Sequence, residues 1–165
     1  IAAHYTPFHD TLTAQVARNL DEYKYSFLFD IHSCPSVGPP SDPDAGQERP
    51  DIIFGDANGR SCDSALVDAL MTLTKEFGLS AALNTPYPGG YNTRKFSARP
   101  DGRYANAPFG PQGSESLQIE YNRKTFGFDE KGLALKDSEA FTFMQRYTGA
   151  LLDTLSDHVR RKIPP

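Results

Sequence analysis

The sequence has few cysteines, no tryptophan and no long apolar run. Its two cysteines, Cys34 and Cys62, are too few for a disulfide framework in 165 residues, and they indicate a reduced, cytoplasmic protein. No apolar stretch approaches the roughly 20 residues that a membrane helix needs, which argues against a membrane partner. The net charge is −4 and the basic residues are scattered, which argues against nucleic acid. What remains is a globular chain of one ordinary domain.

Glycine and proline are abundant by contrast, with 13 residues of each, and they gather in residues 35–60 and 86–113. Much of the chain is therefore expected to be shaped loop. Elsewhere the apolar spacing predicts helices and strands in alternation, which favours an α/β fold with a mixed, largely parallel sheet flanked by helices. The predicted helices are 6–22, 63–77 and 137–159, and the predicted strands are 25–31, 52–54, 79–84 and 116–122.

Several boundaries have a local signal. Thr6 followed by Pro7 is expected to begin the first helix. Asp63 is expected to cap the second helix and Gly78 to end it, and Asp137 to cap the third. The run YSFLFDI at 25–31 is short, aromatic and apolar, which is typical of a strand covered on both faces.

His32 stands at the end of that run, two residues after Asp30. Residues two apart in a strand point to the same face, and a carboxylate beside a histidine orients the ring and raises its basicity. Ligands of α/β sheets bind beyond the carboxyl ends of strands, where His32, Asn84 and Glu120 are all expected. We therefore predict His32 as a metal ligand supported by Asp30. The alternative is a half-buried histidine that closes a strand.

Glu120 lies in the segment LQIEYNR, where Gln118, Glu120 and Asn122 share one face of the predicted strand. Three polar groups on one face of a central strand are costly to bury without a function. An edge strand with a solvated face would explain them equally well. Because general-base hydrolysis requires a carboxylate near a metal-bound water, Glu120 is the candidate base.

The segment NTPYPGGYNTR, residues 84–94, combines a bent backbone with side chains suited to an anion. Its prolines and glycines fix a loop that can approach a ligand closely. Tyr91 and Asn92 offer neutral hydrogen bonds, and Arg94 offers a planar fork that matches a carboxylate. We predict that these three side chains bind substrate. A solvated arginine after a turn is the competing interpretation of Arg94.

Cys34 suggests a different chemistry, in which it acts as a nucleophile with His32 as its base. The two residues are only two positions apart, on a predicted turn, and this spacing does not favour the required geometry. The metal-based hypothesis is preferred.

Five blocks follow one another over residues 5–123: YTPFHDTL, FDIHSCPS, PDIIFGDANGRSCD, NTPYPGGYNTR and LQIEYNR. Together they resemble the N-formylglutamate amidohydrolase family. The resemblance implies a fold similar to that of the zinc carboxypeptidases and aspartoacylase. It also implies zinc-dependent hydrolysis of the amide bond of a small anionic N-acyl amino acid. In the reaction that names the family, N-formylglutamate gives formate and glutamate, a late step in histidine degradation.

The resemblance assigns roles to individual residues by motif. His32 of DIHS matches the last zinc ligand of the family, and Glu120 of QIEYNR matches the carboxylate that activates the water. Arg94, together with Tyr91 and Arg123, is the candidate for holding the carboxylate of the substrate.

The sequence departs from the family pattern in one large respect. The family takes its first two zinc ligands from a segment upstream of the PFH block, and here that segment does not precede it. A catalytic zinc needs three protein ligands and a water. We therefore expect residues 1–165 to form a single α/β domain that is the C-terminal portion of a longer amidohydrolase domain.

Three explanations of the missing ligands remain open. An upstream segment of the same protein supplies them, His4 or His9 replaces them, or the chain binds no metal and is a binding or structural module on the same scaffold. A further hypothesis keeps the chemistry and changes the substrate to peptides or cell-wall fragments.

Overall fold

The computed structural model describes residues 2–97, 113–127 and 137–163. Four strands form one sheet: β1 (Ser26–Cys34), β2 (Ile52–Gly55), β3 (Ala81–Leu83) and β4 (Ser114–Asn122). Their order in space is β1-β4-β2-β3. β1 is parallel to β4 and β2 is parallel to β3, whereas β2 runs antiparallel to β4. The predicted mixed, largely parallel sheet is confirmed.

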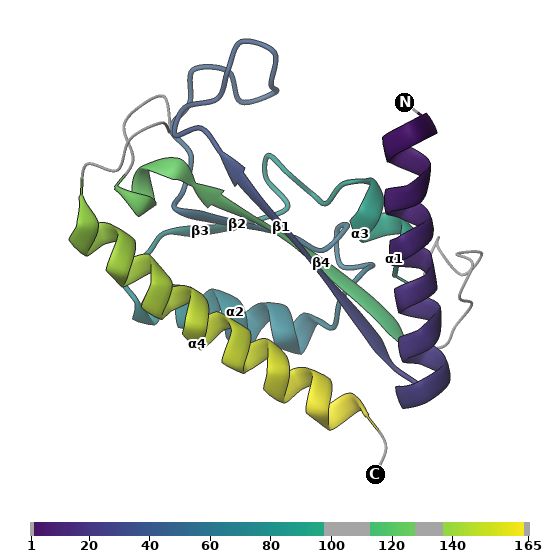
Figure 1. Cartoon of the computed structure of the whole chain (residues 1–165). Coiled ribbons are helices and arrows are strands. Elements are labelled where there is room, and N and C mark those ends of the chain that lie inside the picture. The colour runs from purple at the N-terminus through teal and green to yellow at the C-terminus, as the bar shows by residue number, and fades with distance from the viewer. Residues whose placement is uncertain (1, 98–112, 128–136, 164–165) are drawn as a thin grey trace.

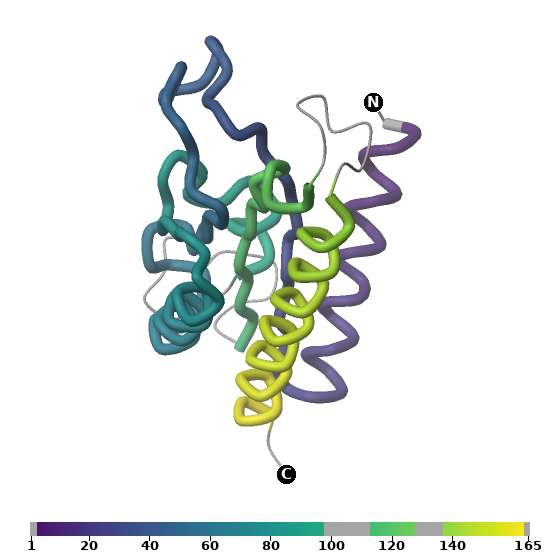
Figure 2. Tube along the Cα trace, turned by 90° about the vertical axis from the view of Figure 1, so that its left-hand side faces the viewer, coloured from purple at the N-terminus to yellow at the C-terminus, as the bar shows by residue number. Residues whose placement is uncertain are grey.

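Helices cover both faces of the sheet (Figure 1). The helices α2 (Ser64–Glu76) and α4 (Ser138–Lys162) pack on one face, and α1 (Ala2–Tyr23) and the short α3 (Tyr91–Lys95) lie on the other. Figure 2 shows the strands between α2 and α1. A 3-10 helix, η1 (Arg123–Phe126), follows β4 directly. Among the described residues, no helix has both the length and the apolar character needed to span a bilayer.

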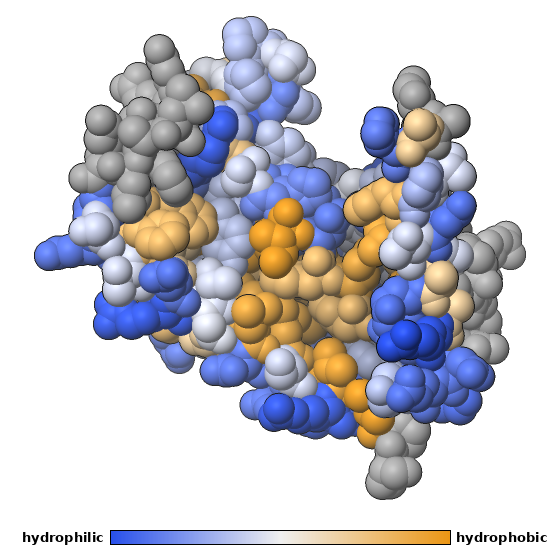
Figure 3. Space-filling model, in the orientation of Figure 1, coloured by the Kyte–Doolittle hydropathy of each residue, from blue (hydrophilic) through white to orange (hydrophobic). Residues whose placement is uncertain are grey.

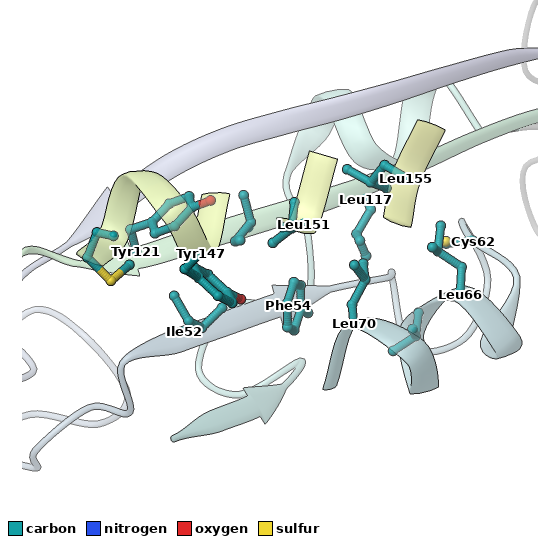
Figure 4. Packing of buried hydrophobic residues seen from close by; sticks show 13 residues of the cluster. Ile52, Phe54, Cys62, Leu66, Leu70, Leu117, Tyr121, Tyr147, Leu151 and Leu155 are labelled. Carbon is teal, nitrogen blue, oxygen red and sulfur yellow. The ribbon is translucent and has the colours of Figure 1, made fainter. Parts of the chain in front are cut away.

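The main core lies between the sheet and the helices α2 and α4 (Figure 4). Ile52 and Phe54 of β2, Leu117 of β4 and Tyr147 of α4 are completely buried there. Burial of each such side chain contributes about 1.5–3 kcal/mol. The hydroxyl of Tyr147 shares a hydrogen bond of 2.8 Å with Oγ1 of Thr74, so this polar atom is satisfied inside the core.

Alternation along β1 decides which side chains reach which face. Phe27 and Phe29 pack against the main core, and Leu28 packs against a smaller cluster formed with α1. Because successive side chains of a strand point to opposite faces, Asp30 and His32 lie with Leu28 on the α1 face. The apolar run before His32 thus anchors β1 from both sides and delivers two polar groups to one of them.

The predicted signals of α2 and α4 are confirmed. Asp63 caps α2 by accepting a hydrogen bond from the N–H of Ala65, and Gly78 follows the helix at φ 74°. Asp137 caps α4 by accepting from the N–H groups of Glu139 and Ala140. Each cap of this kind stabilises a helix by about 1 kcal/mol.

The predicted start of α1 is wrong, because the helix already includes Ala2 and Pro7 lies inside it. Pro7 cannot donate to the carbonyl four residues earlier, so this first part of the helix depends on packing. The ring of His9 provides it, with centroids 4.2 Å from Tyr5 and 5.1 Å from Tyr91 of α3. The sequence also missed α3, which is only five residues long.

The predicted positions of the strands in the sheet need correction. β1 is an edge strand of the described sheet. Its residues 27–29 pack on both faces, but Ile31 and His32 near its end are exposed, so the predicted coverage does not extend to the end of the run. β4 is central, with every residue buried, so the alternative of a solvated edge is wrong for Glu120. β3 runs opposite to β1 and β4, and Asn84 after it bonds to Asp56 instead of joining His32.

Candidate active site

His32 and Glu120 are direct partners in the pairing of β1 with β4. Neighbouring strands lie about 4.8 Å apart, and paired residues of a parallel sheet point to the same face. The imidazole and the carboxylate therefore project side by side on the α1 face. The structure brings these two side chains together as the sequence led us to expect, and their chemical roles remain predictions.

Asp30 lies two residues before His32, and its Oδ1 is 3.0 Å from Nε2 of the ring. The side chain of Asp30 is 17% exposed and that of His32 is 47% exposed, so the ring is accessible while its partner is mostly covered. Since Asp30 occupies Nε2, Nδ1 is the nitrogen with which His32 could bind a metal. This contact has the form of a carboxylate that orients a ligand histidine.

Gln118 connects Glu120 to the loop before α3. Its Oε1 accepts a hydrogen bond of 2.7 Å from the N–H of Gly90, which turns its Nε2 toward Glu120. Nε2 then donates to Oε1 of Glu120 at 2.9 Å. Because Gln118 is buried and both ends of its amide are engaged, it fixes the orientation of the carboxylate.

Burial raises the pKa of Glu120. The charge of His32 and the hydrogen bond from Gln118 act in the opposite direction, because both favour the ionised carboxylate. A carboxylate with a raised pKa is a stronger base than an exposed one. The environment of Glu120 therefore suits proton abstraction.

The loop before α3 is held close to β2. A Cβ atom on Gly55 would come within 2.6 Å of the backbone nitrogen of Gly89, so only glycine permits this approach. The N–H of Ala57 also donates to the carbonyl of Pro88 at 2.7 Å. These contacts fix the start of α3 relative to the sheet.

The predicted substrate-binding residues of α3 differ in their surroundings. Tyr91 is exposed and packs beside His9. Oδ1 of Asn92 is buried and has no hydrogen-bond partner among the described residues. Arg94 is exposed, and its Nη1 donates to the carbonyl of Gly89 at 2.7 Å. One nitrogen of the Arg94 guanidinium is thus held by the loop that precedes α3.

Arg123 and Cys34 lie where β4 and β1 end. Burial raises the pKa of Cys34 to about 11, and the charges of Arg49 and Arg123 counteract this only in part. A thiol with this pKa is protonated at neutral pH, and His32 directs Nε2 to Asp30. The structure therefore gives no support to Cys34 as a nucleophile.

Arg49 is a buried cation that the sequence analysis missed. It is 2% exposed, and it donates from Nε and Nη2 to the two oxygens of Asp44, both at 2.7 Å, and from Nη2 to Asp42 at 2.6 Å. Its guanidinium also lies 4.9 Å from the ring centroid of Tyr87, whose hydroxyl donates to Asp42. Arg49 thereby closes the loop between β1 and β2. Two aspartates shortly before a lone arginine were the signal in the sequence.

The described residues do not assemble a metal site. The described parts of the chain contain no group of three or more His, Cys, Asp or Glu side chains that could hold an ion. His9 packs among aromatic rings, so the idea that it replaces a missing ligand finds no support. His32 fits one ligand position, and the described residues do not complete a zinc site around it.

The comparisons with known proteins agree on one family. The family model described as N-formylglutamate amidohydrolase matches residues 1–126. The N-formylglutamate deformylase of Pseudomonas putida is 34% identical over 91 residues, which cover 54% of this chain and 33% of that protein. The protein of the same name from Pseudomonas aeruginosa is 34% identical over 97 residues, which cover 58% of this chain and 35% of that protein.

One solved structure is similar over nearly the whole chain. It is the crystal structure of N-formylglutamate amidohydrolase from Ralstonia eutropha JMP134, with a TM-score of 0.72 and 26% identity. The similarity covers 96% of this chain and 52% of that one. The chain therefore spans about a third of the length of the curated relatives and about half of the solved relative.

Proposed function

Because the chain belongs to the N-formylglutamate amidohydrolase family, we propose that its site takes part in hydrolysis of the amide bond of a small anionic N-acyl amino acid. N-formylglutamate, which gives formate and glutamate, is the first candidate substrate. The observation that carries this proposal is the direct pairing of His32 with Glu120 on adjacent strands. Asp30 supports the histidine and Gln118 supports the carboxylate from the same face.

Glu120 acts as the general base in this proposal. Its carboxylate takes a proton from the attacking water and then returns the proton to the leaving nitrogen. The hydrogen bond from Gln118 holds the carboxylate in place for both transfers. The raised pKa of Glu120 favours the first transfer, since the proton is accepted by a stronger base than an exposed glutamate.

His32 would supply one ligand of a zinc ion through Nδ1, and the other ligands would come from outside the described residues. A zinc ion bound there would polarise the scissile carbonyl and lower the pKa of a bound water to about 7. Asp30 sets the orientation of His32 and stabilises its donated proton.

The residues of α3 and η1 recognise the anionic part of the substrate. Arg94 offers the outer side of its guanidinium to a carboxylate, since Nη1 is engaged with the carbonyl of Gly89. Tyr91 and Asn92 add neutral hydrogen bonds, and Arg123 adds positive charge at the end of β4. Selection by charge would then distinguish acyl-glutamates from neutral amides.

A metal-free binding module is the second candidate, and one observation favours it: no three metal-binding side chains gather among the described residues. Elemental analysis of the purified protein separates the two. A stoichiometric transition metal supports the hydrolase, whereas a metal-free protein whose melting temperature rises with an acyl-glutamate supports the binding module.

The hydrolase is tested by measuring formate released from N-formylglutamate and from a panel of other acyl-amino acids and small peptides. We expect Glu120→Gln to keep the metal content and to lose turnover by at least about 100-fold. Glu139→Gln is the matched control, because Glu139 is exposed in the first turn of α4. Equal turnover in Glu120→Gln and the unmodified protein would remove Glu120 from the mechanism. A panel in which peptides are preferred would change the substrate class.

A further inference from the structure

Two loops meet beside Glu120, and β4 holds one end of each. Gln118, Glu120 and Asn122 share one face of β4, and all three side chains are buried. Gln118 accepts a hydrogen bond of 2.7 Å from the N–H of Gly90, at the end of the loop before α3. Nδ2 of Asn122 donates to the carbonyl of Arg49 at 3.0 Å, at the end of the loop between β1 and β2. The candidate base therefore lies between two anchor points, one for each loop.

The loop between β1 and β2 is held by a buried ion pair. It projects beyond the end of the sheet (Figure 1), and Figure 3 shows that its surface is largely hydrophilic. Arg49 holds it through hydrogen bonds of 2.6–2.7 Å to Asp42 and Asp44. The hydrogen bond from Arg49 lowers the pKa of Asp42, so this carboxylate is ionised at neutral pH. The loop thereby holds a charged acceptor in a fixed place.

Tyr87 connects the loop before α3 to this acceptor. Its hydroxyl donates to Oδ2 of Asp42 at 2.9 Å, and Nη2 of Arg49 donates to the same oxygen. The guanidinium also lies 4.9 Å from the centroid of the Tyr87 ring, within the range of a cation–π contact. Burial and the hydrogen bond to Asp42 raise the pKa of Tyr87 to about 12, so the phenol keeps the proton that it donates. A hydrogen bond to an ionised acceptor is stronger than one between neutral groups, so this link is a firm one.

Two residues separate Tyr87 from Gly90, and this segment is also held by β2. The N–H of Ala57 donates to the carbonyl of Pro88 at 2.7 Å. A Cβ on Gly55 would lie 2.7 Å from the carbonyl oxygen of Tyr87, so the two backbones are in close contact. The segment is therefore held from two sides, by β2 and by the loop between β1 and β2.

These contacts form a closed frame around Glu120. The frame runs, in order, through Gln118, Gly90, Tyr87, Asp42, Arg49 and Asn122. We propose that Tyr87 is a positioning residue of the candidate site, because its hydrogen bond to Asp42 closes this frame and keeps the carboxylate of Glu120 in place. This inference rests on the proposed function, in which that carboxylate moves the proton of the attacking water.

Opening the frame should affect the reaction more than the binding of substrate. Without the tether at Tyr87, Gly90 separates from Gln118 more often, and Nε2 of Gln118 is then free to turn away from Glu120. A misplacement of about 1 Å in a reacting group can lower the rate about 100-fold. Because the frame acts on the base, kcat should fall more than KM rises.

Tyr87→Phe tests the inference, and Tyr147→Phe is the matched control. Each change removes one hydroxyl, and that of Tyr147 bonds to Thr74 at 2.8 Å in the main core, on the opposite face of the sheet. Hydrogen exchange of the Gly90 amide, followed by nuclear magnetic resonance, reports on the frame and needs no turnover. With both variants brought to the same global stability by urea, we expect this amide to exchange at least about fivefold faster in Tyr87→Phe.

Turnover tests the link to the base. We expect kcat for formate release to fall about tenfold or more in Tyr87→Phe, with KM changed by less than about threefold. In Tyr147→Phe, kcat should stay within about twofold of the value for the unmodified protein. A double-variant cycle with Gln118→Ala checks the route, since Tyr87→Phe should lower kcat little further once the side-chain amide of Gln118 is gone.

Three results would overturn the inference. An equal exchange rate of the Gly90 amide in the two variants would mean that the frame holds without the bond to Asp42. Equal losses of kcat in the two variants, or fully additive losses in the cycle, would mean that Tyr87 does not act through Gln118. If the unmodified protein releases no formate, while Gly90 exchange responds to Tyr87→Phe and not to Tyr147→Phe, the proposed function fails and the frame is supported.

Discussion

Replacing Arg49 by methionine is expected to destabilise the fold, because it removes a buried ionic contact. Arg49 makes three charged hydrogen bonds of 2.6–2.7 Å to Asp42 and Asp44, and its side chain is 1% exposed. Removing one partner of a buried ion pair costs about 3–5 kcal/mol when the other charge stays buried. The carboxylates of Asp42 and Asp44 are 23% and 14% exposed, so water reaches them in part and lowers the cost.

The loss of stability is reduced further by Nη1 of Arg49, a buried donor that has no acceptor among the described residues. The substitution removes this unsatisfied donor together with the ion pair. We therefore expect a loss of about 2–4 kcal/mol. With a urea dependence of about 2 kcal/mol per molar, the unfolding midpoint should fall by about 1–2 M. The urea midpoint of Arg49→Lys should lie between those of the unmodified chain and Arg49→Met, because lysine keeps the charge but loses the bidentate contact with Asp44.

The pH dependence of stability gives an independent check of the contact between Arg49 and the two aspartates. Arg49 lowers the pKa of Asp42 and of Asp44. A carboxyl whose pKa is lower in the folded protein stabilises it above the usual carboxyl range and loses that contribution as the pH falls. The urea midpoint of the unmodified chain should therefore decrease between about pH 6 and pH 3, and it should decrease less in Arg49→Met.

Arg160→Met is the matched control, because Arg160 pairs with Asp157 at 3.2 Å on the surface, where both side chains are largely exposed. Such pairs contribute little to stability. The reasoning about Arg49 is refuted if its methionine variant unfolds at the same urea concentration as the control. It is also refuted if the two variants lose stability equally on acidification.

Three further predictions concern the site and the loop beside it. His32→Ala should abolish stoichiometric zinc in the metal-loaded protein without unfolding it, and unchanged zinc by elemental analysis would contradict the ligand assignment. Cys34 should resist alkylation in the folded protein at pH 8, because its pKa of about 11 leaves roughly one thiolate in a thousand. Peptide mass spectrometry locates the label, and rapid labelling of Cys34 would support the nucleophile hypothesis. Gly55→Ala should lower the melting temperature, because the added Cβ displaces the loop at Gly89. Gly149→Ala is the control: its Cβ would lie in open space on α4, and the change should raise stability by up to about 1 kcal/mol. An unchanged melting temperature of Gly55→Ala would contradict the close approach.

The elements that the sequence predicted correctly are those with strong local signals. α2 and α4 have an aspartate cap and a sustained apolar face, and both begin where these signals predict. α3 has five residues, which is too short for a helical period to be visible. The start of α1 was misplaced because Pro7 is a good first-turn residue by propensity, whereas packing of His9 on Tyr91 extends the helix before it.

The candidate site was predictable in part for a different reason. Alternation along each strand correctly put Asp30 with His32 and Gln118 with Glu120. That the two strands are neighbours depends on pairing between distant segments, which no local pattern specifies, and here the ordered family motifs supplied the expectation. Arg49 was missed because a lone arginine in a polar loop usually contacts solvent. Its burial follows from the way that loop folds back on Asp42 and Asp44.

The two halves of the candidate site are held in different ways. Glu120 stands on the buried central strand β4, and Gln118 ties its carboxylate to the loop before α3 through hydrogen bonds of 2.9 and 2.7 Å. His32 stands on the edge strand of the described sheet, where its ring is 47% exposed and Asp30 lies 3.0 Å from Nε2. Because buried contacts restrict a side chain more than exposed ones, the carboxylate is positioned by the fold, whereas the orientation of the imidazole depends on Asp30.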